Sequence, residues 1–255
     1  MRLLAKYDGL MRIAVISDVH GNLLALDAVL QDIATRAVDL TVNLGDLLSV
    51  ALQPRETADR LMGLDLPTIS GNHERQVLTL PRAQMGRCDR LTFDTITEPQ
   101  REWLSGLPET LELAPGVMAF HGSPTDDLMY LLETVEPTGL RSATDEEVLE
   151  RLGGFASWPL LLCGHTHLPR ARHLPTGALV VNPGSVGWPA YDDDKPYPHV
   201  VEAGSPHARY AVVDDVSGSW TAELLAVDYD WEAAAGMADR QDFTDVGRAL
   251  RTGRV

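Results

Sequence analysis

Residues 12–22 read RIAVISDVHGN and join a short apolar run to a polar turn. The apolar run is rich in β-branched residues and predicts a buried strand. Asn22 stands where it would cap a helix, which the spacing of leucine and alanine predicts over residues 23–37. Asp18 and His20 fall in the turn between strand and helix, so two groups able to bind a metal follow the first strand directly.

The next segments repeat this alternation of strand and helix. Residues 40–44 predict a second strand, and residues 66–70 predict a third. Between them Pro54 occupies the favoured first position of a helix that continues to residue 64. Strands that alternate with helices predict parallel pairing at the start of the sheet, and therefore an α/β fold.

The rest of the chain predicts more helix in the middle and more strand towards the end. Helices are expected at residues 72–80, 89–95, 98–106 and 144–153. Strands are expected at residues 116–120, 159–163, 169–174, 178–182, 209–214 and 220–227. Residues 188–206 are rich in Pro, Asp and Gly and predict a loop. We expect one domain over residues 11–228 and a helical tail over 229–255, with residues 1–10 an extension or an alternative start before Met11.

Polar side chains follow five predicted strands, at the point where each strand ends. They are Asp18 and His20, Asp46 in the pair Gly45-Asp46, Asn72 and His73 in GNHE (71–74), His121, and His165 and His167 in GHTH (164–167). Each motif alone is typical of a turn or a helix cap. In open α/β sheets, however, ligands bind beyond the carboxyl ends of the strands. The five motifs together therefore indicate a site for metal binding or proton transfer.

Charge and cysteine content restrict the classes of partner. The formal net charge is −16, which disfavours stable binding to nucleic acid, although a local cationic site can still bind a small phosphate ester. No apolar run approaches the ~20 residues that a membrane-spanning helix needs, so no membrane association is expected. Two cysteines, Cys88 and Cys163, without a secretory signature predict a reducing, cytoplasmic location. The oligomeric state is not predicted.

Five motifs resemble those of the calcineurin-like metallophosphoesterases: DVH (18–20), GD (45–46), GNHE (71–74), HG (121–122) and GHTH (164–167). Residues 182–187, NPGSVG, are similar to a segment of the small bacterial and archaeal branch that includes phosphodiesterases and diadenosine tetraphosphate hydrolases. The resemblance covers residues 11–228. It implies a four-layer α/β sandwich of two mixed sheets flanked by helices. It also implies an ester hydrolase in which a metal-bridged hydroxide attacks a phosphodiester or a dinucleoside polyphosphate.

The resemblance further implies two divalent ions and assigns ligands to them. The first ion would be held by Asp18, His20 and His167, the second by Asn72, His121 and His165, and both by Asp46. Paired ions about 3.5–4 Å apart stabilise the attacking and leaving oxygens of a displacement at phosphorus. Nitrogen and oxygen ligands without thiolate suit Mn, Fe, Zn, Co or Ni. The resemblance favours manganese, followed by iron.

His73 is outside this ligand set. In the family, the histidine of this motif lies near the leaving-group oxygen and acts as a general acid or stabilises charge. Many members carry a second acid, in the pattern GDxxD, that orients this histidine. Here residues 45–49 read GDLLS, so Ser49 replaces that acid, and Glu74 stands where Asp is common. The sequence leaves open which group orients His73.

Two other classes of function fit the same motifs. A protein serine/threonine phosphatase or a phosphomonoesterase would use the same ions, although the missing second acid and the acidic surface disfavour the protein phosphatase. A non-catalytic interaction protein would keep the fold and lose ligand residues, whereas all seven ligand positions are filled here. Residues 129–132 predict either core or, by preference, a flap over the substrate. No substrate-binding residue is assigned from the sequence.

Overall fold

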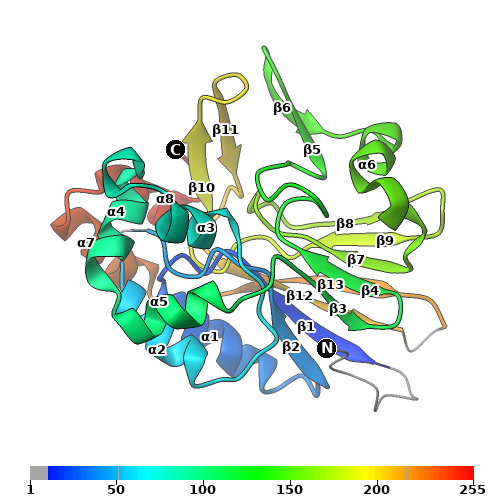
Figure 1. Cartoon of the computed structure of the whole chain (residues 1–255), viewed down its shortest axis with the longest axis horizontal. Helices are drawn as coiled ribbons and strands as arrows, with labels where there is room; N and C mark the ends of the chain where they lie inside the picture. Colours follow the sequence, from blue (N-terminus) through cyan, green and yellow to red (C-terminus); the bar gives the residue numbers. More distant parts are fainter. Residues whose placement is uncertain (1–10, 51, 216–217) are drawn as a thin grey trace.

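The computed structural model describes residues 11–50, 52–215 and 218–255 (Figure 1). The predicted extension at residues 1–10 lies outside the described residues. Within the described ranges, no helix is long and apolar enough to cross a lipid bilayer.

The first sheet has the strand order β13-β12-β1-β2. β1 (Arg12–Ile16) pairs in parallel with β2 (Leu40–Asn43) and antiparallel with β12 (Ala208–Asp214), which in turn pairs with β13 (Thr221–Val227). The crossover from β1 to β2 runs through α1 (Leu23–Ile33), where the Asn22 side chain accepts the Ala25 N–H at 3.2 Å. The helix ends at Ile33, so its predicted extension to residue 37 is wrong, since residues 34–36 form a turn instead.

The second sheet has the order β3-β4-β7-β9-β8. Its centre is parallel, formed by β4 (Val117–Phe120), β7 (Leu160–Leu162) and β9 (Leu179–Asn182). β3 (Thr110–Ala114) and β8 (Arg170–His173) complete the edges as antiparallel strands. Both large sheets are therefore mixed, as the resemblance implied.

Alternation along the strands sorts the core into layers. Ile13 and Val15 face the second sheet, and Ala14 and Ile16 face the helices that cover the first. These helices are α1, α2 (Pro54–Met62) and α5 (Glu98–Ser105). On the far side, α6 (Asp145–Leu152) covers the second sheet, and η2 (Gly153–Ser157) follows it. The expected α/β sandwich of two sheets between helices is confirmed.

Three predictions about secondary structure are wrong or incomplete. Residues 66–70 run beside β2 but make only one bridge, between Thr68 and Asn43, so they form no regular strand. The predicted loop at 188–206 contains a hairpin of β10 (Ala190–Asp193) and β11 (His199–Glu202). A second hairpin, β5 (Glu133–Glu136) and β6 (Gly139–Ser142), has no counterpart in the prediction. Figure 1 shows both hairpins rising from the same edge of the molecule.

The remaining helices surround that edge. α3 (Asn72–Thr79), the short 3-10 helix η1 (Arg82–Gln84) and α4 (Arg87–Thr95) follow the Thr68 bridge. The C-terminal residues form α7 (Trp231–Arg240) and α8 (Thr244–Thr252), as predicted. These two helices bury Ala235, Phe243 and Leu250 in one cluster with Val50 and Leu52. The tail thus covers the chain segment that follows β2.

Candidate metal centre

The predicted ligands lie at one rim, where strands of both sheets end. Asp18 and His20 follow β1, and Asp46 follows β2 in the same sheet. In the other sheet His121 follows β4, and His165 and His167 follow β7, while Asn72 begins α3. Parallel strands point their carboxyl ends in one direction, which explains why motifs far apart in sequence meet.

The structure places six of these residues in two groups: Asp18, His20 and His167, and Asp46, His121 and His165. Within each group the candidate ligand atoms lie within 4.8 Å of one another. In the first group the Nε2 atoms of His20 and His167 are 2.9 Å apart, and His167 Nε2 is 3.3 Å from Asp18 Oδ1. Neighbouring ligands around one ion with bonds of about 2.1 Å have such separations.

The second group adjoins the first. His121 Nε2 is 3.1 Å from Asp46 Oδ2 and 4.0 Å from Asp18 Oδ1, so it lies between a carboxylate of each group. Asn72 lines the same cavity as Asp46. Its neighbour His73 donates its backbone N–H to Asp46 Oδ1 at 3.0 Å, which fixes the orientation of that carboxylate.

Backbone carbonyls set the tautomers of two histidines. His20 Nδ1 is 2.7 Å from the Ser49 carbonyl oxygen, and His121 Nδ1 is 2.7 Å from the Leu44 carbonyl oxygen. A carbonyl oxygen only accepts, so Nδ1 carries the hydrogen in both rings. In the neutral imidazole, Nε2 then presents its lone pair to the ligand group. Ser49 therefore orients His20 through its backbone carbonyl, which does not depend on the side chain at position 49.

The backbone is strained at the ligands. Among the described residues, eight non-glycine residues have a left-handed φ, and five of them are Asp18, His20, Asp46, His165 and His167. Such a conformation costs about 1–3 kcal/mol each and persists where the surroundings enforce it. Here the loops after β1 and β2 enforce it, because Asp18 N–H donates to Gly45 O and His20 N–H donates to Asp46 O, both at 3.0 Å.

Two glycines allow these loops to pack closely. A Cβ atom on Gly71 would overlap the Asp46 carboxylate, and one on Gly164 would overlap the Ser17 hydroxyl. Both positions therefore need the smallest residue for steric reasons, independently of φ.

Burial and neighbouring charges together set the pKa values of the ligand side chains. Burial opposes ionisation of Asp18 and Asp46, but the neighbouring histidines outweigh it and hold the pKa of both carboxyls below the usual range. Burial lowers the pKa of His20 to about 3 and that of His165 to about 4, so both rings are neutral. Burial also opposes protonation of His121, yet the Asp46 carboxylate raises the pKa of that ring to about 10.

The ligand atoms fit a divalent cation. Asn72 Oδ1 is buried and has no hydrogen-bond partner, and Asp18 Oδ1 and His121 Nε2 face only other members of the two groups. Buried polar atoms are nearly always paired, so a buried amide oxygen without a partner beside clustered ligand atoms indicates a missing partner. An oxygen- and nitrogen-rich donor set without thiolate suits Mn, Fe, Zn, Co or Ni.

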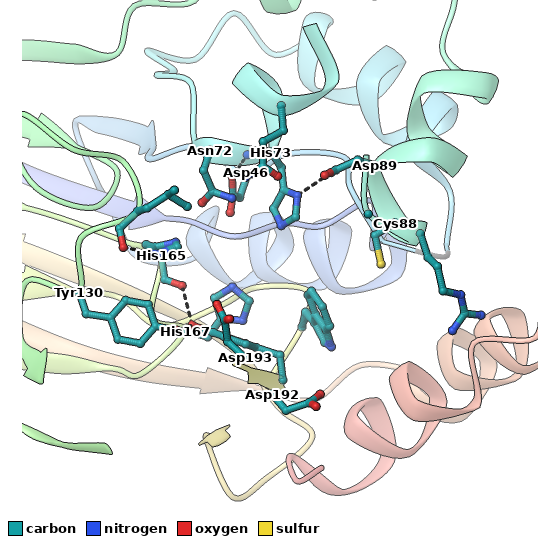
Figure 2. A pocket seen from close by; sticks show the side chains of 16 residues that line it. Asp46, Asn72, His73, Cys88, Asp89, Tyr130, His165, His167, Asp192 and Asp193 are labelled. Atoms are coloured by element: carbon teal, nitrogen blue, oxygen red, sulfur yellow. Dashed lines mark hydrogen bonds and ion pairs between the residues drawn. The ribbon is translucent and has the colours of Figure 1, made fainter. Parts of the chain in front are cut away.

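His73 has a partner that sequence reasoning missed. Its Nδ1 is 2.6 Å from Asp89 Oδ1, and Asp89 is a buried residue in the first turn of α4 (Figure 2). Acidic residues are common in the first turn of a helix, because the helix dipole stabilises a negative charge there. Nothing in the sequence therefore distinguished Asp89 from an ordinary residue at a helix start. Ser49 stands where many members of the family carry the acid that orients this histidine. Here His73 contacts a carboxylate from a different element, that of Asp89 on α4.

Glu74 acts on the backbone. Its carboxylate accepts the N–H groups of Asp46, Leu47 and Gly71 at 2.8–2.9 Å, which ties the loop after β2 to the start of α3. Burial, together with the Asp46 charge, raises the pKa of Glu74 to about 7. The longer Glu therefore positions Asp46 rather than a substrate.

A cavity of about 310 Å³ opens above the two groups. Asp46, His165 and His167 line it (Figure 2). The aromatic residues Trp188 and Tyr191 line it as well. In the described part of the chain, Arg87 is the one arginine or lysine among its lining residues. The segment 129–132 is split between the core and the cavity. Residues 131 and 132 are buried in the core, whereas residue 130 lines the cavity.

Residues 11–203 match the family described as the calcineurin-like phosphoesterase superfamily domain. The chain is 27% identical over 244 residues to the uncharacterized protein MJ0912 of Methanocaldococcus jannaschii, covering 87% of this chain and 89% of that protein. A metallophosphoesterase from Sphaerobacter thermophilus has a TM-score of 0.72 at 23% identity, with 95% of this chain and 98% of that chain covered. The hypothetical protein PH1004 from Pyrococcus horikoshii OT3 has a TM-score of 0.73 at 17% identity, with the same shares covered.

Proposed function

The chain belongs to the calcineurin-like phosphoesterase superfamily, and from this membership we propose that it hydrolyses phosphodiesters or dinucleoside polyphosphates at a pair of divalent ions. The observation that carries the proposal is the adjacency of two ligand groups, joined where His121 Nε2 lies between Asp46 and Asp18. One such group would suit a structural metal as well. Two adjacent groups at the floor of an open cavity suit catalysis.

Each ligand has a proposed place. Asp18, His20 and His167 would hold one ion, Asn72, His121 and His165 would hold the other, and Asp46 would contact both. When bound, two such ions activate a water molecule and neutralise the charge of the phosphoryl oxygens. Manganese is the preferred metal, followed by iron.

His73 is the proposed general acid. The hydrogen bond from Nδ1 to Asp89 orients the ring and leaves Nε2 for the cavity that His73 lines. Burial lowers the pKa of His73, but the Asp46 and Asp89 carboxylates raise it to about 9 in the metal-free protein, and the Asp89 hydrogen bond favours the protonated ring. It can then donate that proton to the departing oxygen of the ester, which contributes about 10²–10⁴-fold in comparable enzymes.

A substrate screen tests the proposal. The metal-stripped protein is reconstituted separately with Mn, Fe(II), Zn, Co and Ni, and hydrolysis is followed for four substrates. These are bis-p-nitrophenyl phosphate, diadenosine tetraphosphate, p-nitrophenyl phosphate and a phosphoserine peptide. We expect metal-dependent hydrolysis of one of the first two, fastest with Mn. Preference for the monoester or the peptide would instead support a phosphatase, and no hydrolysis with metals bound would support an interaction protein on the same fold.

A further inference from the structure

A second hollow, of about 800 Å³, adjoins the cavity above the ligands. It is lined by β5, through Glu133, Thr134 and Val135, and by the turn of the β10–β11 hairpin, through Lys195 and Pro196. Residues 126 and 128–130, from the segment between β4 and β5, line it as well, and we call them its floor. We call this hollow the hairpin groove. Its volume lies in the range of small-molecule sites, about 300–1,000 Å³.

The hairpin groove is continuous with the metal cavity. Five residues line both hollows: Gln76, Leu128, Tyr130, His165 and Asp193. The groove begins at the second ligand group, where His165 Nε2 lies 3.2 Å from the Leu128 carbonyl oxygen. Figure 2 shows His165 and Tyr130 at one end of the cavity, and Asp89 and Cys88 at the other. A phosphate above the ligands would therefore have one substituent towards His73 and Asp89 and the other towards the groove.

The floor of the groove is held in place from three sides. The Tyr130 hydroxyl is 2.7 Å from the Tyr191 hydroxyl and 3.1 Å from His199 Nε2, which links the floor to the β10–β11 hairpin. Arg75 pairs with Asp127 through two hydrogen bonds of 2.7 Å. A third anchor comes from α6, where Arg151 donates to the carbonyl oxygens of residues 130, 131 and 133 at 2.8–3.0 Å. The groove is therefore preformed, which lowers the entropy lost on binding.

The lining is apolar at its centre. Leu128 is 49% exposed and Met129 is 37% exposed, and both lie beside Tyr130, Val135 and Pro196. Large apolar side chains that remain exposed next to a reactive centre indicate a surface that a ligand covers. An apolar lining that includes the aromatic side chain of Tyr130 suits a ring-bearing group.

The charges of the groove do not favour an anion. Among the described residues, three carboxylates line it, on Asp126, Glu133 and Asp193, with two cations, on Arg151 and Lys195. Arg170 pairs with Glu133 at 2.5 Å, so carboxylates and cations balance. A chain of phosphates entering this groove would meet no surplus of positive charge, whereas a neutral group needs none.

Resting on the function proposed above, we propose that the hairpin groove binds a neutral, nucleoside-sized, ring-bearing group attached directly to the scissile phosphorus. Apolar contact with Met129, Leu128 and Val135 supplies the affinity, and Gln76, Thr134 and Lys195 supply hydrogen-bonding edges. The groove then selects a nucleoside phosphodiester over a substrate in which further phosphates separate the nucleoside from the reacting phosphorus.

Two esters with the same leaving group test the groove. They are the p-nitrophenyl ester of thymidine 5′-monophosphate and methyl p-nitrophenyl phosphate, with diadenosine tetraphosphate as the third substrate. We expect the nucleoside ester to have a KM about tenfold lower than the methyl ester. Met129→Ala should raise the KM of the nucleoside ester about fivefold and leave the methyl ester unchanged. Met62→Ala is the matched control, because Met62 is 38% exposed on α2 and lines neither hollow.

Binding supplies a second readout. Calorimetric titration should show thymidine 5′-monophosphate binding about tenfold tighter than inorganic phosphate, with this difference reduced in Met129→Ala but not in Met62→Ala. Equal KM values for the two esters, an equal effect of Met129→Ala on both, or a preference for diadenosine tetraphosphate would overturn the groove assignment while hydrolysis itself persists. Loss of all hydrolysis in the reconstituted protein would overturn the proposed function and the groove with it.

Discussion

The ligand cage and the hairpin groove share a boundary at His165, but they are built in opposite ways. The cage consists of the seven predicted ligands, of which all except His165 are buried. The groove is lined by exposed side chains such as Leu128 and Met129, on the segment between β4 and β5. The cage tolerates almost no change of shape, whereas the groove can change side chains without disturbing a core. On the two proposals above, the chemistry would lie in the cage and the substrate preference in the groove.

Their supports differ as well. In the cage, backbone hydrogen bonds between loops hold the strained ligands, as where Gly187 N–H donates to Asp18 O at 3.0 Å. In the groove, side-chain contacts such as the Arg75–Asp127 pair hold the floor. Exposed ion pairs contribute little stability, commonly about 0.2–1 kcal/mol, while a buried ligand cannot be replaced without leaving its partners unpaired. Substitutions should therefore have large effects in the cage and small, substrate-dependent effects in the groove.

Asp46→Asn should have the largest effect. Asn has the same shape but lacks the charge that would hold two ions, so kcat should fall more than about 10³-fold and metal content should drop. Turnover of bis-p-nitrophenyl phosphate and elemental analysis of the purified variant measure both. The matched control is Asp27→Asn, the same change on an exposed carboxylate of α1. Near-normal turnover in Asp46→Asn would refute the shared-ligand role.

His73→Ala should reduce kcat by about 10²–10⁴-fold while both ions stay bound. Asp89→Ala should produce part of this loss, about tenfold or more, because the ring keeps its place in the chain but loses the 2.6 Å bond that orients it. Asp89→Asn, which keeps an acceptor for Nδ1 without the charge, should lie between Asp89→Ala and the parent. Loss of metal in His73→Ala would mean that this residue belongs to the cage as a ligand.

Acidification should release the ions. The Asp46 carboxylate, working against burial, raises the pKa of His121 to about 10 in the metal-free protein, so an ion must displace a proton there. Metal affinity should therefore fall by at least about tenfold for each pH unit between about pH 8 and pH 5, and binding should release at least one proton per chain. His20 and His165, with pKa values near 3 and 4, add no competition in this range. Calorimetric titrations in buffers of different ionisation enthalpy measure the released proton, and pH-independent affinity would contradict the assignment of His121.

Arg75→Ala should have the smallest effect. It removes the ion pair to Asp127 and loosens the floor of the groove, so KM for the nucleoside ester should rise about twofold to fivefold. Hydrolysis of methyl p-nitrophenyl phosphate should be unchanged, since the cage is untouched. Arg60→Ala is the matched control, because Arg60 forms a comparable exposed pair with Asp27 on the helical layer. An equal loss on both esters would place Arg75 in support of the cage.

The cage could be predicted from the sequence because six of its seven residues follow apolar strands, and Asn72 follows the stretch 66–70 that runs beside β2. Its geometry then follows from parallel pairing, which brings the ends of β1 and β2 together in one sheet and the ends of β4 and β7 together in the other. Asp89 could not be predicted, because its link to His73 exists only after α3 and α4 pack together. A local signal for it was absent, since acids are common in the first turn of any helix.

The groove was missed for a different reason. Its hairpins use short strands, and β10–β11 is embedded in a segment rich in Pro, Asp and Gly that resembles a loop. Alternation was present, since His199 and Val201 are buried and Val200 is exposed, but four residues are too few to establish a period against that composition. The opposite error was made at residues 66–70. An apolar stretch there predicted a strand, but the segment forms only one bridge, to β2 of the first sheet.

The proposed hydrolysis requires two cations bound side by side at the rim of the sheets. Crystals of the protein reconstituted with Mn, measured at the Mn absorption edge, test this claim most directly. We predict two anomalous peaks about 3.5–4 Å apart, one at Asp18, His20 and His167 and the other at Asn72, His121 and His165, with Asp46 between them. A single peak, or density at neither group in fully reconstituted crystals, would contradict it.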